Sequence, residues 1–255
     1  MAENMFARYT SWSGLMIRFW RGFLVVSAFV VFGIASLILG LIYIPIGKIF
    51  IKNKRKTFSH LIHKLWCSYT HFLMWLRIFK LNLYNITPLN GKIIVATHPS
   101  FIDILILIGL YDNSLCLAKK ELLNNIFLKN IIKNVYIPNN IELDEFKRIC
   151  TEALNDGYNI IIFPTGTRTC EGEELKIHKG AAALQISSGV DIIPIKMECD
   201  YSFLQKGKPI YDAGDKIITY KISQLATIKL KDFDEKSEIK LRNAISEKIK
   251  FDFTR

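Results

Sequence analysis

The stretch KIIVATHPSFIDILILIGL, residues 92–110, decides the fold of this chain. Residues 92–97 predict a short buried strand, and residues 99–110 predict a helix, because proline suits the first helical position. The same alternation continues along the chain, with strands at 114–118, 135–137, 158–163, 190–197 and 216–222, and helices at 119–133, 141–155, 178–188 and 237–251. Strands alternating with helices of about 10–15 residues predict an α/β fold, a mostly parallel central sheet flanked by helices.

Two residues able to do chemistry follow the first strand. His98 stands at the strand-to-helix junction, and Asp103 comes a little over one turn later. Because His98 lies outside the helix, its ring can fold back onto the carboxylate, which would fix the tautomer at Nδ1 and leave Nε2 to take a proton. The sequence contains no G-x-S-x-G nucleophile motif, so this base must activate a hydroxyl or a water that arrives with the substrate.

A second block, FPTGTRT at residues 163–169, follows another apolar strand. In a parallel sheet both loops emerge at the carboxyl edge, where ligands bind. Gly166 lets the backbone approach a ligand closely, the neighbouring hydroxyls of Thr165 and Thr167 can donate, and Arg168 offers a fork for phosphate or another oxyanion. The alternative is a surface turn with a solvated arginine.

These two blocks, in this order, resemble the glycerolipid acyltransferase family, whose members pair a His-x4-Asp block with a later Phe-Pro-Glu-Gly-Thr-Arg block. The segments AKKEL (118–122) and IIPI (192–195) resemble two further family segments, so the likeness runs from about residue 93 to 195. The resemblance implies an enzyme without cofactor or metal, in which His98 deprotonates an acceptor hydroxyl that attacks the thioester of acyl-CoA or acyl carrier protein. The acceptor would be a lysophospholipid or a related lipid.

By the same resemblance, Asp103 holds the imidazole and a further set of residues binds the substrates: Ser100, Lys119, Thr165, Gly166, Thr167, Arg168 and Pro194. Two positions depart from the family pattern. Thr165 stands where the family usually has Glu, and the uncharged IPNNI (137–141) stands where its second block usually ends in Asp-Arg. The lost arginine puts lysophosphatidate or glycerol 3-phosphate as acceptor in doubt. This version is similar to a subgroup associated with fatty-acid-like or polyene biosynthesis, which would favour an acyl carrier protein donor.

The N-terminal third carries all of the chain's excess positive charge. Residues 1–92 have 12 Lys and Arg against one acidic residue, whereas residues 93–255 have 22 of each sign. The 26 residues from 22 to 47 are uncharged and long enough to cross a bilayer as a helix, or to enter it as a re-entrant hairpin. The heavier basic cluster, at 48–56, places the following domain on the cytoplasmic face, in a bacterial inner membrane. Basic charge beside apolar sequence favours a membrane with anionic lipids as partner, and the neutral body disfavours nucleic acid.

An apolar stripe at helical spacing runs from Phe58 to Phe79. It predicts an amphipathic helix lying at the membrane interface or packing on the next domain. His60 and His63 have a spacing that suits a metal, but interfacial polar residues are the favoured interpretation. We therefore expect three parts: a membrane anchor with basic flanks (1–57), an interfacial helix and linker (58–91), and the α/β domain (92–255).

The five scattered cysteines favour free thiols over a disulfide framework or a zinc site. Two other functions stay open beside acyl transfer. A thioester hydrolase would use the same pair of residues to activate water, and a non-catalytic membrane protein would bind lipid or acyl carrier without turnover.

Overall fold

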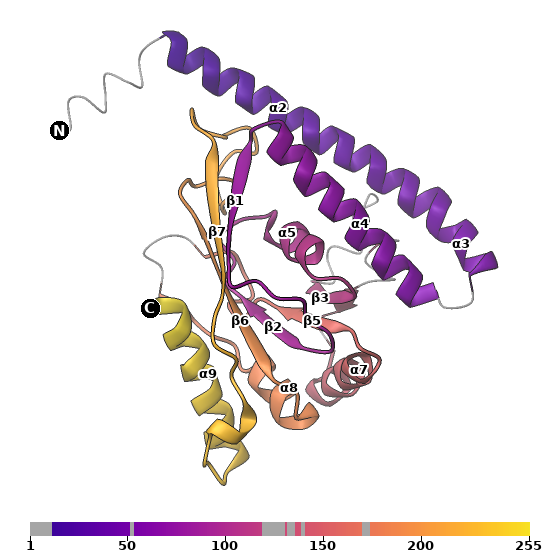
Figure 1. Ribbon diagram of the computed structural model, residues 1–255, viewed down its shortest axis with the longest axis vertical. Helices are drawn as coiled ribbons and strands as arrows, with labels where there is room; N and C mark the ends of the chain where they lie inside the picture. The colour runs from indigo at the N-terminus through magenta and orange to yellow at the C-terminus, as the bar shows by residue number, and fades with distance from the viewer. Residues whose placement is uncertain (1–11, 52–53, 119–130, 132–135, 139–140, 170–173) are drawn as a thin grey trace, which may run out of the picture.

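The computed structural model describes residues 12–51, 54–118, 131, 136–138, 141–169 and 174–255. Its centre is one seven-stranded sheet with the order β1-β7-β6-β2-β5-β3-β4 (Figure 1). The strands are β1 (Phe79–Tyr84), β2 (Ile93–Ala96), β3 (Ser114–Ala118), β4 (Tyr136–Pro138), β5 (Asn159–Ile162), β6 (Ile192–Cys199) and β7 (Ile218–Gln224). All neighbours pair in parallel except β6 and β7, which pair antiparallel. The predicted mostly parallel sheet flanked by helices is confirmed.

Helices cover both faces of this sheet. The elements are α2 (Trp12–Ile38), η1 (Leu39–Tyr43), α3 (Ile44–Phe50), α4 (Lys54–Trp75), α5 (Asp103–Leu110), α7 (Leu143–Asn155), α8 (Gly180–Ser188), η3 (Leu230–Asp232) and α9 (Glu238–Thr254). The helices α4 and α5 pack together on one face, and α7, α8 and α9 form the layer on the other (Figure 1). The helix expected at 119–133 lies almost entirely outside the described residues.

The first strand was not predicted. The apolar stripe predicts a helix as far as Phe79, but α4 ends at Trp75 and Phe79 begins β1. Arg77 turns the chain between them, with a φ of 57°. The ring of Phe79 then packs edge-on against Tyr220 of β7, with 5.4 Å between the centroids. Residues before 92 therefore contribute an edge strand to the α/β sheet, because β1 pairs with β7 along its whole length.

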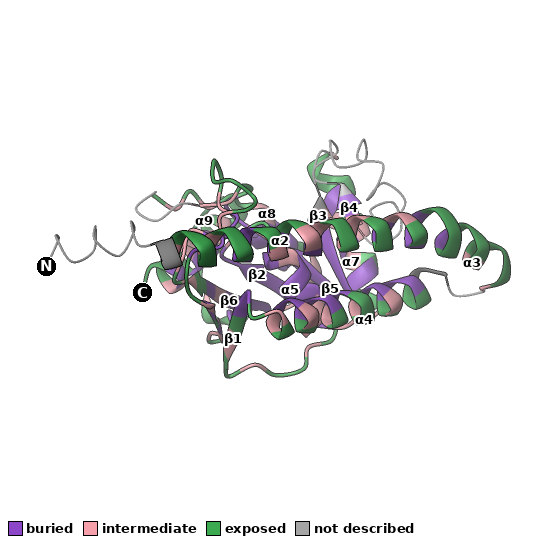
Figure 2. Cartoon of the chain, turned by 90° about the horizontal axis from the view of Figure 1, so that it is seen from above, coloured by how far each residue is buried: buried purple, intermediate pink, exposed green. Residues whose placement is uncertain are grey.

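The apolar N-terminal run forms one continuous helix through α2, η1 and α3, with no hairpin inside it. This run, from Gly14 to Phe50, is long and apolar enough to cross a membrane. One side of it packs on α4, where the ring of Phe32 contacts those of Trp66 and Tyr69 at about 5 Å. The outward side is exposed along the length of the helix (Figure 2).

Arg21 fastens this long helix to the α/β body. Its guanidinium donates to three backbone carbonyls, those of Arg77 (2.9 Å), Ile78 (2.9 Å) and Ala213 (3.2 Å). Arg21 is buried, and its bonds to Ile78 and Ala213 form away from bulk water, whereas the bond to Arg77 is part-buried. Charge-assisted bonds of this kind are stronger than neutral ones, and they join α2 to the α4–β1 turn and to the loop before β7.

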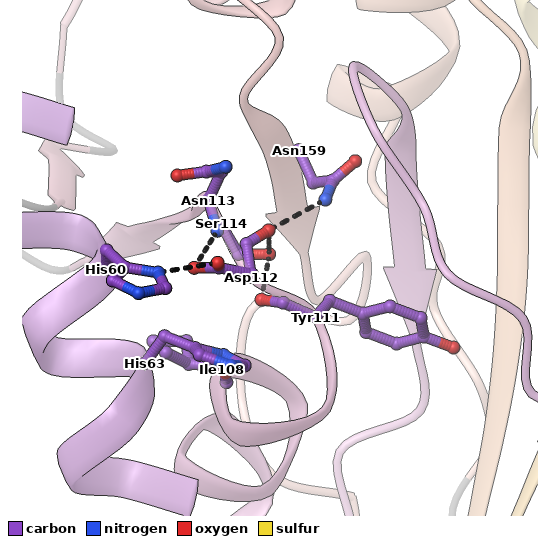
Figure 3. A network of polar contacts seen from close by, with 8 residues as sticks. All are labelled: His60, His63, Ile108, Tyr111, Asp112, Asn113, Ser114 and Asn159. Carbon is purple, nitrogen blue, oxygen red and sulfur yellow. Dashed lines mark hydrogen bonds and ion pairs between the residues drawn. The ribbon is translucent and has the colours of Figure 1, made fainter.

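A polar network holds α4 against α5 and the loop that follows it (Figure 3). His60 Nδ1 lies 2.7 Å from Asp112 Oδ2, and His63 Nδ1 lies 2.8 Å from the carbonyl of Ile108. Asn159 of β5 donates to the carbonyl of Asp112 at 3.1 Å. The helix α4 thus packs on the following domain, and a position at a membrane interface stays a prediction. The described residues contain no cluster of metal-binding side chains, and the four described cysteines are free thiols.

Candidate active site

The two sequence blocks meet at one edge of the sheet. The strands β2 and β5 are parallel neighbours with Ile93 opposite Ile160, so the loops that follow them leave the sheet side by side. The backbone N–H of Thr169 donates to the carbonyl of His98 at 3.0 Å and ties the loops together. This juxtaposition is the one expected for a parallel sheet.

His98 and Asp103 form a direct pair. Nδ1 of His98 lies 2.9 Å from Oδ2 of Asp103, and the same oxygen accepts the backbone N–H of Ser100 at 2.7 Å. The helix α5 begins at Asp103 and not at Pro99, because residues 99–102 form a turn closed by this carboxylate. The Asp103 side chain is 0% exposed, whereas that of His98 is 18% exposed. A buried carboxylate thus stands behind a partly accessible imidazole.

Burial shifts the proton equilibrium of Asp103. Desolvation raises the pKa of the Asp103 carboxyl above its ordinary value. The hydrogen bonds from His98 and from the Ser100 N–H, and the positive charge of Arg168, oppose that rise in the pKa. Ionising Asp103 in this buried position therefore costs free energy, and the hydrogen bonds to the carboxylate offset only part of that cost.

The plane of the imidazole is fixed by stacking. The ring of His98 lies 4.1 Å from that of Phe163, with 21° between the planes. Phe163 directly follows β5, so the second block positions the base of the first. With Nδ1 engaged by Asp103, Nε2 is the nitrogen left to accept a proton.

The Thr165–Arg168 segment is a tight turn. Gly166 has a φ of 68°, a conformation that favours glycine, and its N–H donates to the carbonyl of Phe163 at 3.0 Å. The buried hydroxyl of Thr165 donates to the carbonyl of Thr167 at 2.8 Å, so this side chain braces the turn. Gly166 and Thr167 are exposed. His178, whose ring lies against Gly166, has no sequence motif that marks it as part of this site.

Arg168 reaches across the site toward the loop before β7. Its Nη1 donates to the carbonyl of Leu204 at 2.7 Å, and its guanidinium carbon lies 5.9 Å from the centre of the Phe101 ring. Phe101 N–H donates to the same Leu204 carbonyl at 3.3 Å. The arginine is therefore held beside the His98 turn by defined contacts, unlike a side chain that only meets solvent.

The remaining predicted residues lie apart from this pair of loops or deeper. The Ser100 side chain is 1% exposed, so its N–H is the group it offers to the site. Pro194 is buried on β6 opposite Val95, within the sheet and behind the loops. Lys119 lies outside the described residues, as do Asn139 and Asn140 of the uncharged IPNNI segment.

A buried tyrosine near Asp103 was missed by sequence reasoning. Tyr220 of β7 pairs with Cys199 of β6 and is 0% exposed. Burial, together with the charge of Asp103, raises the pKa of Tyr220 well above its ordinary value. Burial likewise raises the pKa of Cys199 to about 11, so both groups stay neutral behind the carboxylate. No local motif marks Tyr220, because only the β6–β7 pairing brings it here.

The fold and the site together define an α/β protein whose candidate active site pairs a base with a buried carboxylate beside a Gly-Thr-Arg turn. Residues 77–198, slightly under half of the chain, match the family model described as Acyltransferase.

Curated relatives carry one name. The chain is 27% identical over 153 residues to "1-acyl-sn-glycerol-3-phosphate acyltransferase LPAT1, chloroplastic" from Arabidopsis thaliana, covering 56% of this chain and 42% of that protein. It is 28% identical over 138 residues to the 1-acyl-sn-glycerol-3-phosphate acyltransferase of Bacillus subtilis (strain 168), covering 52% and 66%. The chain thus spans about half the length of the curated relatives it matches.

A solved structure shares the fold over nearly the whole chain. The 1-acyl-sn-glycerophosphate (LPA) acyltransferase PlsC from Thermotoga maritima aligns with a TM-score of 0.68. The alignment covers 93% of this chain and 97% of that one at 21% identity. This likeness includes the N-terminal helices as well as the sheet.

Proposed function

We propose that the chain is a membrane-associated O-acyltransferase. It moves a fatty acyl group from acyl-CoA or acyl carrier protein to a hydroxyl of a lysophospholipid or a related lipid. The observation that carries this proposal is the 2.9 Å contact between His98 and Asp103, at the sheet edge where the Gly166–Arg168 turn also lies. The family of residues 77–198 and the names of the relatives point the same way.

The chemistry follows from that geometry. Nε2 of His98 takes the proton of the acceptor hydroxyl as its oxygen attacks the thioester carbonyl carbon. The C–O bond forms, the C–S bond breaks, and the imidazolium returns its proton to the leaving thiolate. Asp103 stabilises the imidazolium through Nδ1. A thioester is already activated, so a positioned base suffices without a covalent acyl-enzyme.

The Gly166–Arg168 turn binds the acceptor headgroup. A guanidinium has five N–H donors in a fixed fork, of which Leu204 takes one. The exposed backbone of Gly166 and the hydroxyl of Thr167 stand beside it. An anionic headgroup next to these donors would bring its free hydroxyl close to His98.

The exposed side of α2 and α3 attaches the protein to the membrane. It presents large apolar side chains that are at least half exposed, such as Phe19 (78%), Ile49 (77%) and Phe50 (79%). The other side of α2 is packed on α4, so the helix would lie along the bilayer surface with its outward side immersed, and not stand upright across it. We further propose that this side meets the cytoplasmic leaflet, because the anionic lipids of that leaflet suit the basic residues of the 48–56 segment.

The test is a panel of acyl-CoA and acyl carrier protein donors against lysolipid acceptors, with products identified by mass spectrometry. The proposal predicts an acylated lipid formed in step with thiol release. Free fatty acid without an acylated lipid would identify a thioester hydrolase. Binding of a donor without any product would identify a non-catalytic binding protein.

A further inference from the structure

We propose that the turn formed by residues 205–211 is a second membrane-docking element, which sits on an anionic bilayer together with α2 and places the His98 site beside the lipid surface. This inference rests on the proposed function, because it assigns the surface through which that site meets its lipid acceptor. The turn, with the sequence QKGKPIY, belongs to the loop between β6 and β7.

The turn is in direct contact with α2. A Cβ placed on Gly22 would lie 2.6 Å from the carbonyl oxygen of Tyr211, so only glycine permits this approach of the two backbones. The adjacent Arg21 donates to the carbonyl of Ala213 at 3.2 Å. Figure 1 shows this loop, in orange, reaching the N-terminal half of α2. The loop is thereby fixed to the helix that carries the exposed apolar side.

The exposed side chains of the turn extend that apolar side. Ile210 is 47% exposed and Tyr211 is 61% exposed. Phe19 and Val26 stand one helical turn before and after Gly22 and are themselves exposed. The turn and the helix thus present one apolar surface, larger than either would present alone, and large exposed apolar patches mark interaction sites.

The same flank of α2 leads to the catalytic turn. Phe29 lies seven residues after Gly22, on the same side of the helix, and its ring centroid is 6.4 Å from that of Phe101. Phe101 is 43% exposed, lies 5.9 Å from the Arg168 guanidinium and follows His98 by three residues. A bilayer seated on Phe19 and Tyr211 would therefore reach Phe101, beside the His98 turn.

Charge selects an anionic lipid surface as the occupant. Lys206 and Lys208 are both exposed, and residues 205–211 contain no acidic side chain. The next acidic residue, Asp212, accepts the Tyr201 hydroxyl at 2.6 Å and is half-buried. Basic residues at the rim of an apolar patch suit anionic headgroups.

Hydrogen–deuterium exchange of the purified full chain tests the docking without relying on catalysis. Peptides covering 205–212 should exchange more slowly with phosphatidylcholine vesicles that contain phosphatidylglycerol than in detergent-free buffer without vesicles. Protection of α2 with unchanged exchange at 205–212 would overturn the inference while leaving the proposed function standing. Protection by acyl carrier protein in place of vesicles would overturn it too, because it would assign the turn to a protein partner.

Two double variants test the role of the side chains. Lys206→Gln with Lys208→Gln should weaken partitioning onto phosphatidylglycerol vesicles by roughly thirtyfold, since each basic residue near anionic lipid contributes about fivefold. Ile210→Ser with Tyr211→Ser should slow acyl transfer to a lysolipid held in vesicles and leave the rate with a short-chain, monomeric acceptor unchanged. The matched control for the lysine pair is Lys231→Gln with Lys240→Gln, and the control for the apolar pair is Ile239→Ser on α9. All three residues are exposed and remote from α2. The inference would be overturned if the test and control variants had equal effects. It would also be overturned if Ile210→Ser with Tyr211→Ser lowered the acyl-transfer rate equally with the vesicle-bound and the monomeric acceptor.

Discussion

Replacing Asp103 by Asn isolates the contribution of the buried carboxylate. The change keeps the size of the side chain but removes the charge that faces His98 Nδ1 at 2.9 Å. Because the carboxylate is 0% exposed, its interaction with the imidazolium is little screened by water. We expect a loss of about 3–5 kcal/mol of transition-state stabilisation, which corresponds to a fall in kcat of about 10²–10⁴-fold.

The assay follows acyl transfer to a lysolipid at saturating donor and varied acceptor. The fall should appear in kcat with little change in the KM for the acceptor, because Asp103 acts through His98 and is buried away from the lipid. A kcat within about threefold of the unmodified chain would refute the assignment of Asp103 as the orienting group.

The same variant makes a separate prediction about stability. Since burial raises the pKa of Asp103, the folded chain keeps a proton over a pH range in which the unfolded chain has lost it. The free-energy cost of burying the ionised carboxylate is absent when the pH lies below the ordinary pKa of about 3.9. It is complete only when the pH lies above the raised pKa of the folded chain. Asp103→Asn should therefore gain stability relative to the unmodified chain as pH rises through this window, measured by thermal unfolding. A difference that does not change with pH would contradict the raised pKa.

Three further substitutions probe the loops and the anchor. Arg168→Lys loses the planar fork that contacts Leu204, so the KM for an anionic acceptor should rise about tenfold. An unchanged KM and kcat would mean that the Arg168 side chain meets only solvent. Gly166→Ala places a Cβ at a φ of 68° and 3.3 Å from the His178 ring, which should cost about 1–2 kcal/mol and lower the Tm; an unchanged Tm would contradict the strained turn. Arg21→Gln removes charged donors from three backbone carbonyls, two of them in buried bonds. It should lower the free energy of unfolding by about 2–4 kcal/mol in urea titrations in detergent. An equal loss in Lys48→Gln, an exposed control, would argue against a specific contribution of these bonds.

Much of the site could be predicted because it depends on local sequence. A strand that ends just before a His-Pro step positions His98, and the turn of residues 99–102 brings Asp103 back to it. The parallel sheet then places the Gly166 turn beside this pair. These steps need only strand order and the geometry of one turn.

The contacts that depend on distant pairing could not be predicted. Phe79 continues a helical stripe in the sequence, but Arg77 turns the chain before it. Phe79 therefore begins a strand that pairs with β7. Arg168 and Arg21 donate to the carbonyls of Leu204 and Ala213, which both lie in the loop between β6 and β7. The sequence of this loop has no regular pattern. Periodicity describes one element at a time, so it carries no signal for contacts between elements that lie far apart in sequence.

The apolar N-terminal run could likewise be predicted only in part. Hydropathy identifies the apolar run of residues 22–47 but does not reveal which of its sides is covered. The packing of Phe32 against Trp66 and Tyr69 shows which side is covered, and it leaves the opposite side of α2 exposed.

The most direct measurement of the central claim is the acyl-transfer rate of His98→Ala. The account predicts a loss of at least about 10²–10⁴-fold in kcat, with circular dichroism and vesicle binding unchanged, because the side chain that takes the proton is gone while the fold and the membrane surface remain. A folded, membrane-bound His98→Ala protein that transfers acyl groups at the rate of the unmodified chain would contradict it.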